Sequence, residues 1–263
     1  MNAQNKKILI VIQARRGSTR LPDKVMLPLK DKPLLLRMYE RIEAAKVKKE
    51  IVIAATTEKE DDLIAVLCRE NNLNCFRGHA EDLIDRHYKA ALEYNADIVV
   101  KIPSDCPLIC PDVIDNVIGY YLENEGKFDF VSNLHPATHP DGNDVEVIPV
   151  GILKTTWEEA KQDFEREHTT SFIWDNPERF RIGNVIWETG LDFSKSHRFT
   201  IDYKEDYDFI KRIYDELYDE NKVFKLCDIM MLLDREPGIM KLNEMHAGEY
   251  WYDFYKNELK TVN

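Results

Sequence analysis

The sequence predicts an α/β fold built on a single doubly wound, mostly parallel sheet. Three segments have the continuous aliphatic character of strands covered on both faces, at residues 8–12, 50–56 and 97–102. Helical periodicity lies between and around them, at residues 33–45, 60–71 and 81–94. Strands that alternate with helices in this way pair in parallel, and such sheets bind ligands at the carboxyl ends of the strands.

The first strand continues into a polar loop, residues 13–24. The loop has one acid, Asp23, and four cations, which are Arg15, Arg16, Arg20 and Lys24. A glycine, a serine and a threonine at 17–19 add a flexible backbone with spare donors. Such a loop between a strand and a helix is typical of phosphate binding. The alternative is a solvated basic loop, which we disfavour because four cations in an acidic chain indicate an anionic ligand.

Two well-known phosphate motifs are absent from this loop. It has neither the Gly-x-x-x-x-Gly-Lys-Ser/Thr spacing of the NTPases nor the dinucleotide pattern Gly-x-Gly-x-x-Gly. The loop therefore predicts a nucleotide site outside these two classes.

The following elements each have their own pattern. In the helix at 33–45 a proline opens the first turn, and one face is formed by Leu34, Leu35, Met38 and Ile42. In the helix at 60–71 the residues expected to point inward are Leu63, Ile64 and Leu67. A short strand at 74–78 ends in a turn before the helix at 81–94.

The second half of the chain is arranged around a turn-rich loop at 134–144. Strands are expected at 128–132, 145–150, 181–187 and 198–201. Helices are expected at 111–123, 153–161, 204–218 and 225–233, and another ends at Trp174. We expect one domain, residues 1–263, with an inserted layer at about 134–190 and a C-terminal helical extension at 220–263.

The composition excludes several partners. With 263 residues and a formal net charge of −12, the chain lacks the broad basic face that nucleic acids and anionic membranes require. No apolar run approaches the roughly 20 residues of a membrane span, and the N-terminus has no signal-peptide core, so we expect a cytoplasmic protein. The five cysteines are expected to be reduced, mostly buried and without zinc: Cys68, Cys75, Cys106, Cys110 and Cys227.

Two acids follow predicted strands, Asp105 after 98–102 and Asp202 after 199–201. Because strand ends of one sheet meet at one edge, both carboxylates are expected within reach of one ion. Mg²⁺ in nucleotidyl transfer is held by one or two carboxylates together with substrate phosphates. The alternative for either acid alone is a helix N-cap, since each precedes a predicted helix or turn.

Five segments together resemble the sugar cytidylyltransferases. They are Ile12-Gln13-Ala14-Arg15-x-Gly17-Ser18-Thr19-Arg20-Leu21-Pro22-x-Lys24, Ser104-Asp105-Cys106-Pro107-Leu108-Ile109, Asp141-Gly142-x-Asp144-Val145-Glu146-Val147, Arg166-Glu167-His168-Thr169-Thr170 and Arg198-Phe199-Thr200-Ile201-Asp202. This family includes the CMP-sialate and CMP-Kdo synthetases, and the likeness is greatest to its spore-coat polysaccharide branch. The resemblance spans about residues 8–215. The chain departs from the family at Tyr203-Lys204, where Thr-Pro is usual.

The resemblance implies a Rossmann-like fold of the nucleotide-diphospho-sugar transferase type and a homodimer formed through the inserted layer. The nucleotide-binding residues that it implies are Gln13, Ala14, Arg15, Gly17, Ser18, Arg20, Lys24 and Asp105. Among them Arg15, Arg20 and Lys24 would act on the triphosphate, and Asp105 with Asp202 would hold Mg²⁺.

For the acceptor, the resemblance points to Asp144, Glu146, Arg166 and His168. Strand alternation places Asp144 and Glu146 on one face, where the alternative is a solvent-facing pair. Arg166 and His168 could bind an anionic group, and the alternative is a cap of the following helix, which we expect for Glu167.

The predicted activity is transfer of CMP from CTP to a small-molecule acceptor with release of pyrophosphate, in the synthesis of a surface polysaccharide or glycan precursor. The acceptor would be a sugar, a sugar acid or its phosphate, and its identity stays open. One alternative is a glycosyltransferase of the same architecture, although Asp105 lacks the Asp-x-Asp partner that such enzymes typically carry. The other is a nucleotide-sensing module, which needs no metal-binding carboxylates.

Overall fold

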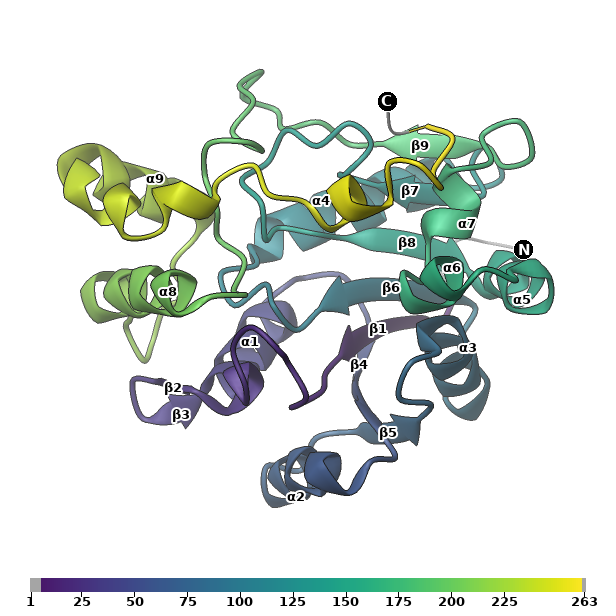
Figure 1. Ribbon diagram of the computed structural model, residues 1–263, viewed down its shortest axis with the longest axis horizontal. Coiled ribbons are helices and arrows are strands. Elements are labelled where there is room, and N and C mark those ends of the chain that lie inside the picture. The colour runs from purple at the N-terminus through teal and green to yellow at the C-terminus, as the bar shows by residue number, and fades with distance from the viewer. Residues whose placement is uncertain (1–5, 262–263) are drawn as a thin grey trace.

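Seven strands form the central sheet, in the order β5-β4-β1-β6-β8-β7-β9 (Figure 1). The computed structural model describes residues 6–261. The strands of this sheet are β1 Ile8–Gln13, β4 Glu50–Thr56, β5 Cys75–Gly78, β6 Ile98–Pro103, β7 Phe130–Ser132, β8 Glu146–Pro149 and β9 Ile182–Asn184. A separate hairpin pairs β2 Pro28–Leu29 with β3 Lys32–Pro33.

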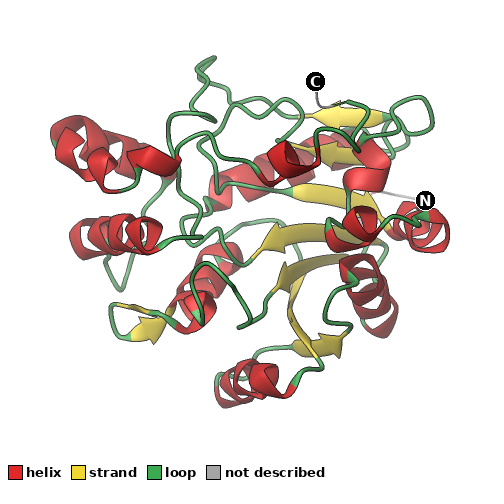
Figure 2. Ribbon diagram, in the orientation of Figure 1, coloured by secondary structure: helices red, strands yellow, loops and turns green. Residues whose placement is uncertain are grey.

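Helices cover both faces of the sheet (Figure 2). The α-helices are α1 Leu34–Glu43, α2 Asp62–Glu70, α3 Leu83–Glu93, α4 Pro111–Glu123, α5 Val150–Glu159, α6 Asp163–Glu167, α7 Ser171–Trp174, α8 Lys204–Leu217 and α9 Leu226–Arg235. Short 3-10 helices lie at Lys24–Met26, Lys59–Asp61, Pro237–Leu242, Glu244–His246 and Trp251–Tyr255. Within residues 6–261, no helix is long and apolar enough to cross a membrane.

Strand β1 divides the core into two halves, because successive side chains point to opposite faces of a sheet. Ile8, Ile10 and Ile12 pack with apolar residues of α1, α2, α4, α8 and α9. Leu9 and Val11 pack on the other face with residues of α3, α5 and α7. The whole aliphatic run is buried, which confirms the predicted burial of this strand on both faces.

The sheet is mostly parallel, as predicted. β1 pairs in parallel with β4 and β6, and β4 pairs in parallel with β5. β8 is the reversed strand, antiparallel to β6 and β7, and β9 is again parallel to β7. The segment predicted as an inserted layer, 134–190, supplies β8 and β9 to the sheet and α5, α6 and α7 to one of its faces.

Two differences from the predicted elements have a clear physical cause. Residues 198–201 form no strand of the described sheet, because they run across the strand ends, where Phe199 N donates to Asp141 O and Ile201 N donates to Asp105 O. Helix α5 begins three residues earlier than predicted, because β8 ends at a proline, whose fixed φ suits the entry into a helix.

Two burial predictions also need correction. Leu63 was expected to point inward but is 49% exposed. The other two predicted residues do point inward: Ile64 is buried and Leu67 packs against the core. Cys68, one turn after Ile64, is also buried and takes the place of Leu63 in the inward stripe. Cys227 is exposed, whereas Cys68, Cys106 and Cys110 are buried as expected; all five cysteines are unpaired thiols.

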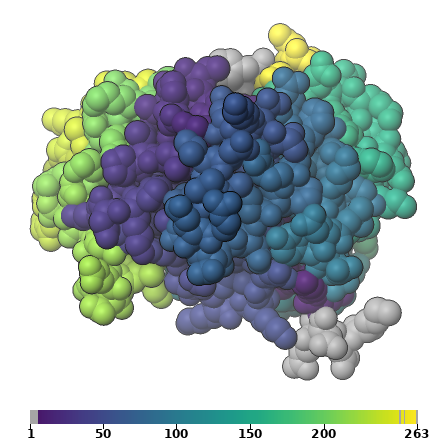
Figure 3. All heavy atoms as spheres, turned by 90° about the horizontal axis from the view of Figure 1, so that it is seen from below, coloured from purple at the N-terminus to yellow at the C-terminus, as the bar shows by residue number. Residues whose placement is uncertain are grey.

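The C-terminal segment returns across the molecule after α9. In Figure 1 the yellow chain leaves α9, passes over α4 and approaches β9. Seen from below (Figure 3), the visible face is formed mainly by the first half of the chain, and the C-terminal segment shows only at its margins.

Candidate active site

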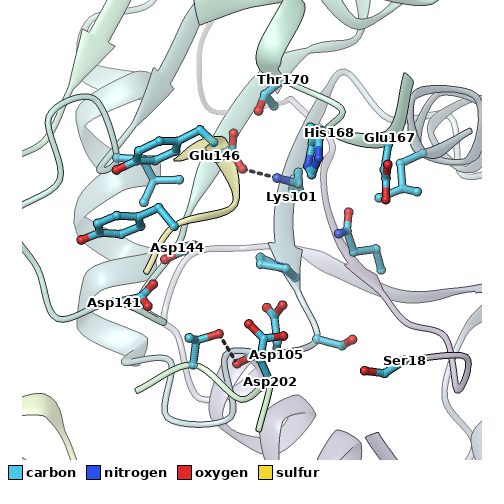
Figure 4. A pocket seen from close by; sticks show the side chains of 18 of the residues that line it. Ser18, Lys101, Asp105, Asp141, Asp144, Glu146, Glu167, His168, Thr170 and Asp202 are labelled. Carbon is cyan, nitrogen blue, oxygen red and sulfur yellow. Dashed lines mark hydrogen bonds and ion pairs between the residues drawn. The ribbon is translucent and has the colours of Figure 1, made fainter. Parts of the chain in front are cut away.

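A cavity of about 390 Å³ opens at the carboxyl ends of β1 and β6, where the sequence predicts the ligand. Most of the predicted site residues line it: Gln13, Ala14, Arg15, Ser18, Arg20, Lys24, Asp105, Asp144, Glu146, His168 and Asp202. Gly17 and Arg166 are not among its lining residues. Figure 4 shows Asp105 and Asp202 beside each other at one end of the cavity, and Lys101 and Glu146 at the other.

Arg16 holds the loop after β1 in shape. Its guanidinium donates to Asp23 Oδ1 at 2.6 Å and to Glu60 O at 2.7 Å. Its backbone N–H donates to the buried carboxylate of Asp61 at 2.8 Å. Gly17 belongs to the same packing, since a Cβ there would lie 2.7 Å from Glu60 Oε1. Arg16 is therefore a structural residue, which leaves the other three cations of the loop for a ligand.

Lys24 joins the two predicted metal ligands. Its Nζ lies 2.9 Å from Asp202 Oδ1 and 3.7 Å from Asp105 Oδ2, and it donates to Ile201 O at 2.7 Å. Arg20 Nη2 lies 2.7 Å from the same oxygen of Asp202. The cationic loop and both carboxylates therefore meet in one cluster.

The carboxylate of Asp202 does not cap α8. Its Oδ2 accepts a hydrogen bond from the buried Arg198 at 3.1 Å. Burial acts to raise the pKa of Asp202, but the charges of the surrounding lysine and arginines hold it below its ordinary value. The start of α8 is capped by Asp206, whose Oδ2 accepts from the N–H groups of Asp202 and Tyr203. The helix-cap alternative is therefore wrong for Asp202.

The loop after Asp105 is fixed by donors from distant elements. Asp105 O accepts from Ile201 N at 2.9 Å and from Thr200 Oγ1 at 3.0 Å. The carbonyls of residues 107–109 accept from Tyr214 Oη and from the buried guanidinium of Arg41. Sequence reasoning missed Arg41, because an arginine on an amphipathic helix usually faces solvent. The N-cap of α4 is Cys110, so Asp105 does not cap that helix either.

The donor set fits a divalent ion bound together with a nucleotide. Among the residues that the structure describes, no group of three or more His, Cys, Asp or Glu side chains is arranged to hold a metal. A nucleotide-linked ion needs fewer protein ligands, because phosphate oxygens and water complete its shell. Asp105 and Asp202 offer hard oxygen ligands, and a cation, Lys24 Nζ, already lies between them.

Two further acids, Asp144 and Glu146, also line the cavity. Burial and the nearby carboxylates of Asp105 and Glu146 raise the pKa of Asp144 to about 7. Glu146, on β8, is buried and forms an ion pair with Lys101 on β6 (Figure 4). Because both acids line the cavity, the alternative of a solvent-facing pair is wrong.

Gly142 allows the segment that contains Asp141 and Asp144 to pack closely against residues 199–200. Its φ is +97°, and a Cβ would lie 2.6 Å from Phe199 C and Thr200 N. We expect Gly142→Ala to lower the free energy of unfolding by about 2–4 kcal/mol, measured by urea denaturation. Gly119→Ala, in the middle of α4 with open space around the new Cβ, is the control and should stabilise by about 0.5–1 kcal/mol. Equal stability of wild type and Gly142→Ala would contradict the steric argument.

The Arg166-Glu167-His168 segment differs from the prediction at two positions. Arg166 donates through Nε to Asp82 Oδ2 at 2.9 Å and ties α6 to α3, so its guanidinium is not available to an acceptor in the cavity. Glu167, predicted as a cap of the helix that ends at Trp174, lines the cavity instead, and the N-cap residue of that helix, α7, is Thr170. His168 also lines the cavity, where burial lowers its pKa to about 3 and keeps the ring neutral.

The cavity contains further residues that sequence reasoning missed. They are Arg86, Lys101, Trp174, Arg198, Glu249, Tyr250 and Tyr252. Arg86 and Lys101 sit inside ordinary helix and strand patterns, which give no signal of function. Arg198 was detectable as the first residue of the motif that ends at Asp202.

The chain matches a known family. The model of the cytidylyltransferase family matches residues 9–229, so the chain belongs to this family and is a CTP-dependent nucleotidyltransferase. The chain is 30% identical over 236 residues to the spore coat polysaccharide biosynthesis protein SpsF of Bacillus subtilis, covering 88% of this chain and 95% of that protein.

Solved structures agree with this assignment. A cytidylyltransferase from Leptospira borgpetersenii superposes with a TM-score of 0.84 at 34% identity, covering 90% of this chain and 97% of that one. A CMP-2-keto-3-deoxy-manno-octonic acid synthetase complexed with CTP has a TM-score of 0.60 at 15% identity, covering 80% of this chain and 99% of that one. The second likeness shows the shared fold. The predicted family and fold class are thereby confirmed.

Proposed function

We propose that the protein transfers CMP from CTP to an oxygen of a sugar or sugar-acid acceptor, or of its phosphate, for the synthesis of a surface polysaccharide or glycan precursor. The observation that carries this proposal is the cluster of Lys24 and Arg20 with Asp105 and Asp202 inside one cavity. The spore-coat relative supports the polysaccharide context.

In the proposed reaction, an acceptor oxygen forms a bond to the α-phosphorus of CTP while the bond to the leaving pyrophosphate breaks. The acceptor proton passes to solvent or to a nearby carboxylate. Arg15, Arg20 and Lys24 bind and neutralise the triphosphate, which is the main contribution of protein groups to such transfers. Asp105 and Asp202 hold Mg²⁺, which would supply further charge neutralisation at the phosphates.

The acceptor would lie against Asp144 and Glu146. Asp144 and Glu146 offer oxygens to sugar hydroxyls, and the neutral ring of His168 can exchange a hydrogen bond with them. Segment 134–190 would both select the acceptor and form a homodimer. The remaining partners would be CTP and the acceptor alone, in the cytoplasm.

Gln13 offers a structural reason for a preference for cytosine over the other bases. The residue lines the cavity, and its buried Oε1 has no hydrogen-bond partner among the described residues. A buried acceptor of this kind fits the N4 amino donor of cytosine, whereas uracil presents an acceptor at that position. This oxygen supports the proposed recognition of cytosine near Gln13 and Ala14.

We expect pyrophosphate release only with CTP when each of the four NTPs is incubated with Mg²⁺ and a panel of sugar acids and sugar phosphates. CTP should bind at least about tenfold more tightly than UTP, because UTP leaves Gln13 Oε1 unpaired. Thermal shifts measure the binding separately from turnover. Comparable shifts with all four NTPs would contradict the assignment of the base, and a nucleotide-sugar donor that replaces CTP would indicate a glycosyltransferase.

A further inference from the structure

The C-terminal segment enters the active-site cavity from outside the part of the chain that matches the family model, which ends at residue 229. Glu249, Tyr250 and Tyr252 line the same cavity as Asp105, Asp144 and Asp202. In Figure 1 this yellow segment passes α4 on its way from α9 toward β9. It therefore forms a wall of the cavity that the sequence motifs do not account for.

Contacts near the metal-binding end hold the start of this wall. Glu249 O accepts from the buried Arg198 guanidinium at 3.3 Å, and Tyr250 Oη donates to Ser194 O at 2.6 Å. The ring of His246 stacks on Tyr203 with centroids 3.9 Å apart. The wall is thus tied directly to residues that surround Asp202.

The far end of the segment is anchored on α7. Leu259 is buried in the apolar cluster on that face of the sheet. The N–H groups of Lys260 and Thr261 donate to Asp175 Oδ1 at 2.7 and 2.8 Å. Because both ends are fixed, residues 249–252 have a defined position over the cavity.

The two tyrosines of this wall both line the cavity and stack on each other. Their rings are nearly parallel, with centroids 4.9 Å apart and an angle of 10° between planes. Both tyrosines line the same cavity as Asp141 and Asp144. Burial raises the pKa of Tyr250 to about 12, and the carboxylates of Asp141 and Asp144 also raise it. Aromatic rings and carboxylates in one cavity are suited to a polyhydroxylated ring, because its C–H face is apolar and its rim is polar.

We propose that Tyr250 and Tyr252 select the acceptor by packing against the C–H face of its sugar ring while Asp144 and Glu146 accept hydrogen bonds from its hydroxyls. This inference rests on the proposed function, since it assigns the acceptor of the same site to the sugar class. The nucleotide would contact the opposite side of the cavity, where Ser18 lies (Figure 4).

The test compares Tyr252→Ala and Tyr250→Ala with Tyr252→Phe, which keeps the aromatic face. Tyr120→Ala on α4, whose ring packs on Phe128 outside the cavity lining, is the matched control. Saturation-transfer NMR follows the ring protons of 3-deoxy-manno-octulosonate, N-acetylneuraminate and the sugar phosphates of the activity panel. Pyrophosphate release gives KM for CTP and for any sugar that turns over.

In both alanine variants we expect the saturation transfer to the sugar to fall at least fivefold. The KM for the acceptor should rise at least tenfold, while the KM for CTP stays within twofold of the wild-type value. Tyr252→Phe and the control should match wild type. Unchanged sugar signals in both alanine variants, an equal rise in the KM for CTP, or no sugar signal with wild type would each overturn the proposal. Sugar binding without turnover would instead contradict the proposed reaction, whereas the proposed contact of Tyr250 and Tyr252 with the sugar would still hold.

Discussion

Replacing Asp105 or Asp202 with asparagine is expected to lower the turnover of CTP by about 10²–10³-fold, the usual loss when one charge-stabilising group is removed from a transfer site. Each substitution keeps the shape of the side chain but removes the charge that would hold Mg²⁺. The fold should survive, because Asp206 and not Asp202 caps α8, and Arg198 keeps its bonds to Asp206 at 3.0 and 3.3 Å.

The two losses should not add, because both carboxylates would serve one ion. The double variant is therefore expected to be little worse than either single variant. Pyrophosphate release across a Mg²⁺ titration measures this, with thermal unfolding as the test of folding. Asp208→Asn, at an exposed ion pair with Lys204 on α8, is the matched control and should keep full activity. Near-normal turnover by either single variant at limiting Mg²⁺ would show that its carboxylate does not hold the ion.

The parts of the fold that depend on local pattern were predictable from the sequence. The strand at 50–56 and the helix at 111–123 have the predicted boundaries, because continuous hydrophobicity or a proline at the first turn marks their limits. The approach of Asp105 to the cationic loop followed from one rule, that parallel strands end at a common edge. Asp202 reaches the same place by another route, through an extended segment bonded to Asp105 O rather than as the end of a strand.

The parts that depend on distant partners were not predictable. Arg166 is bonded to Asp82, which lies 84 positions earlier in the chain, and no local pattern indicates that pairing. Lys101 reads as an interruption of an apolar strand, yet it is the buried partner of Glu146. The same holds for Tyr250, whose place over the cavity depends on the return of the chain after α9 and on its bond to Ser194 O. Such contacts need the tertiary structure.

Replacing Lys24 with methionine is expected to have opposite effects on two ligands. CTP should bind about 10–150-fold more weakly, which corresponds to the roughly 1.5–3 kcal/mol of a charge-assisted contact to phosphate. Nucleotide-free protein should instead bind Mn²⁺, as a probe of the Mg²⁺ site, more tightly than wild type. The reason is that Lys24 Nζ now lies 2.9 Å from Asp202 and 3.7 Å from Asp105, and competes with a metal for both carboxylates.

Calorimetry with CTP and electron paramagnetic resonance with Mn²⁺ measure the two affinities separately. Lys30→Met removes the same charge from a partly exposed ion pair with Asp215 and should change neither affinity. Weaker binding of both ligands by Lys24→Met would show that the loop had lost its shape. Unchanged CTP affinity would remove Lys24 from the triphosphate site. Only tighter Mn²⁺ binding combined with weaker CTP binding agrees with the proposed role of Lys24. In that role its ammonium group neutralises the two carboxylates in the nucleotide-free protein and contacts the phosphates once CTP is bound.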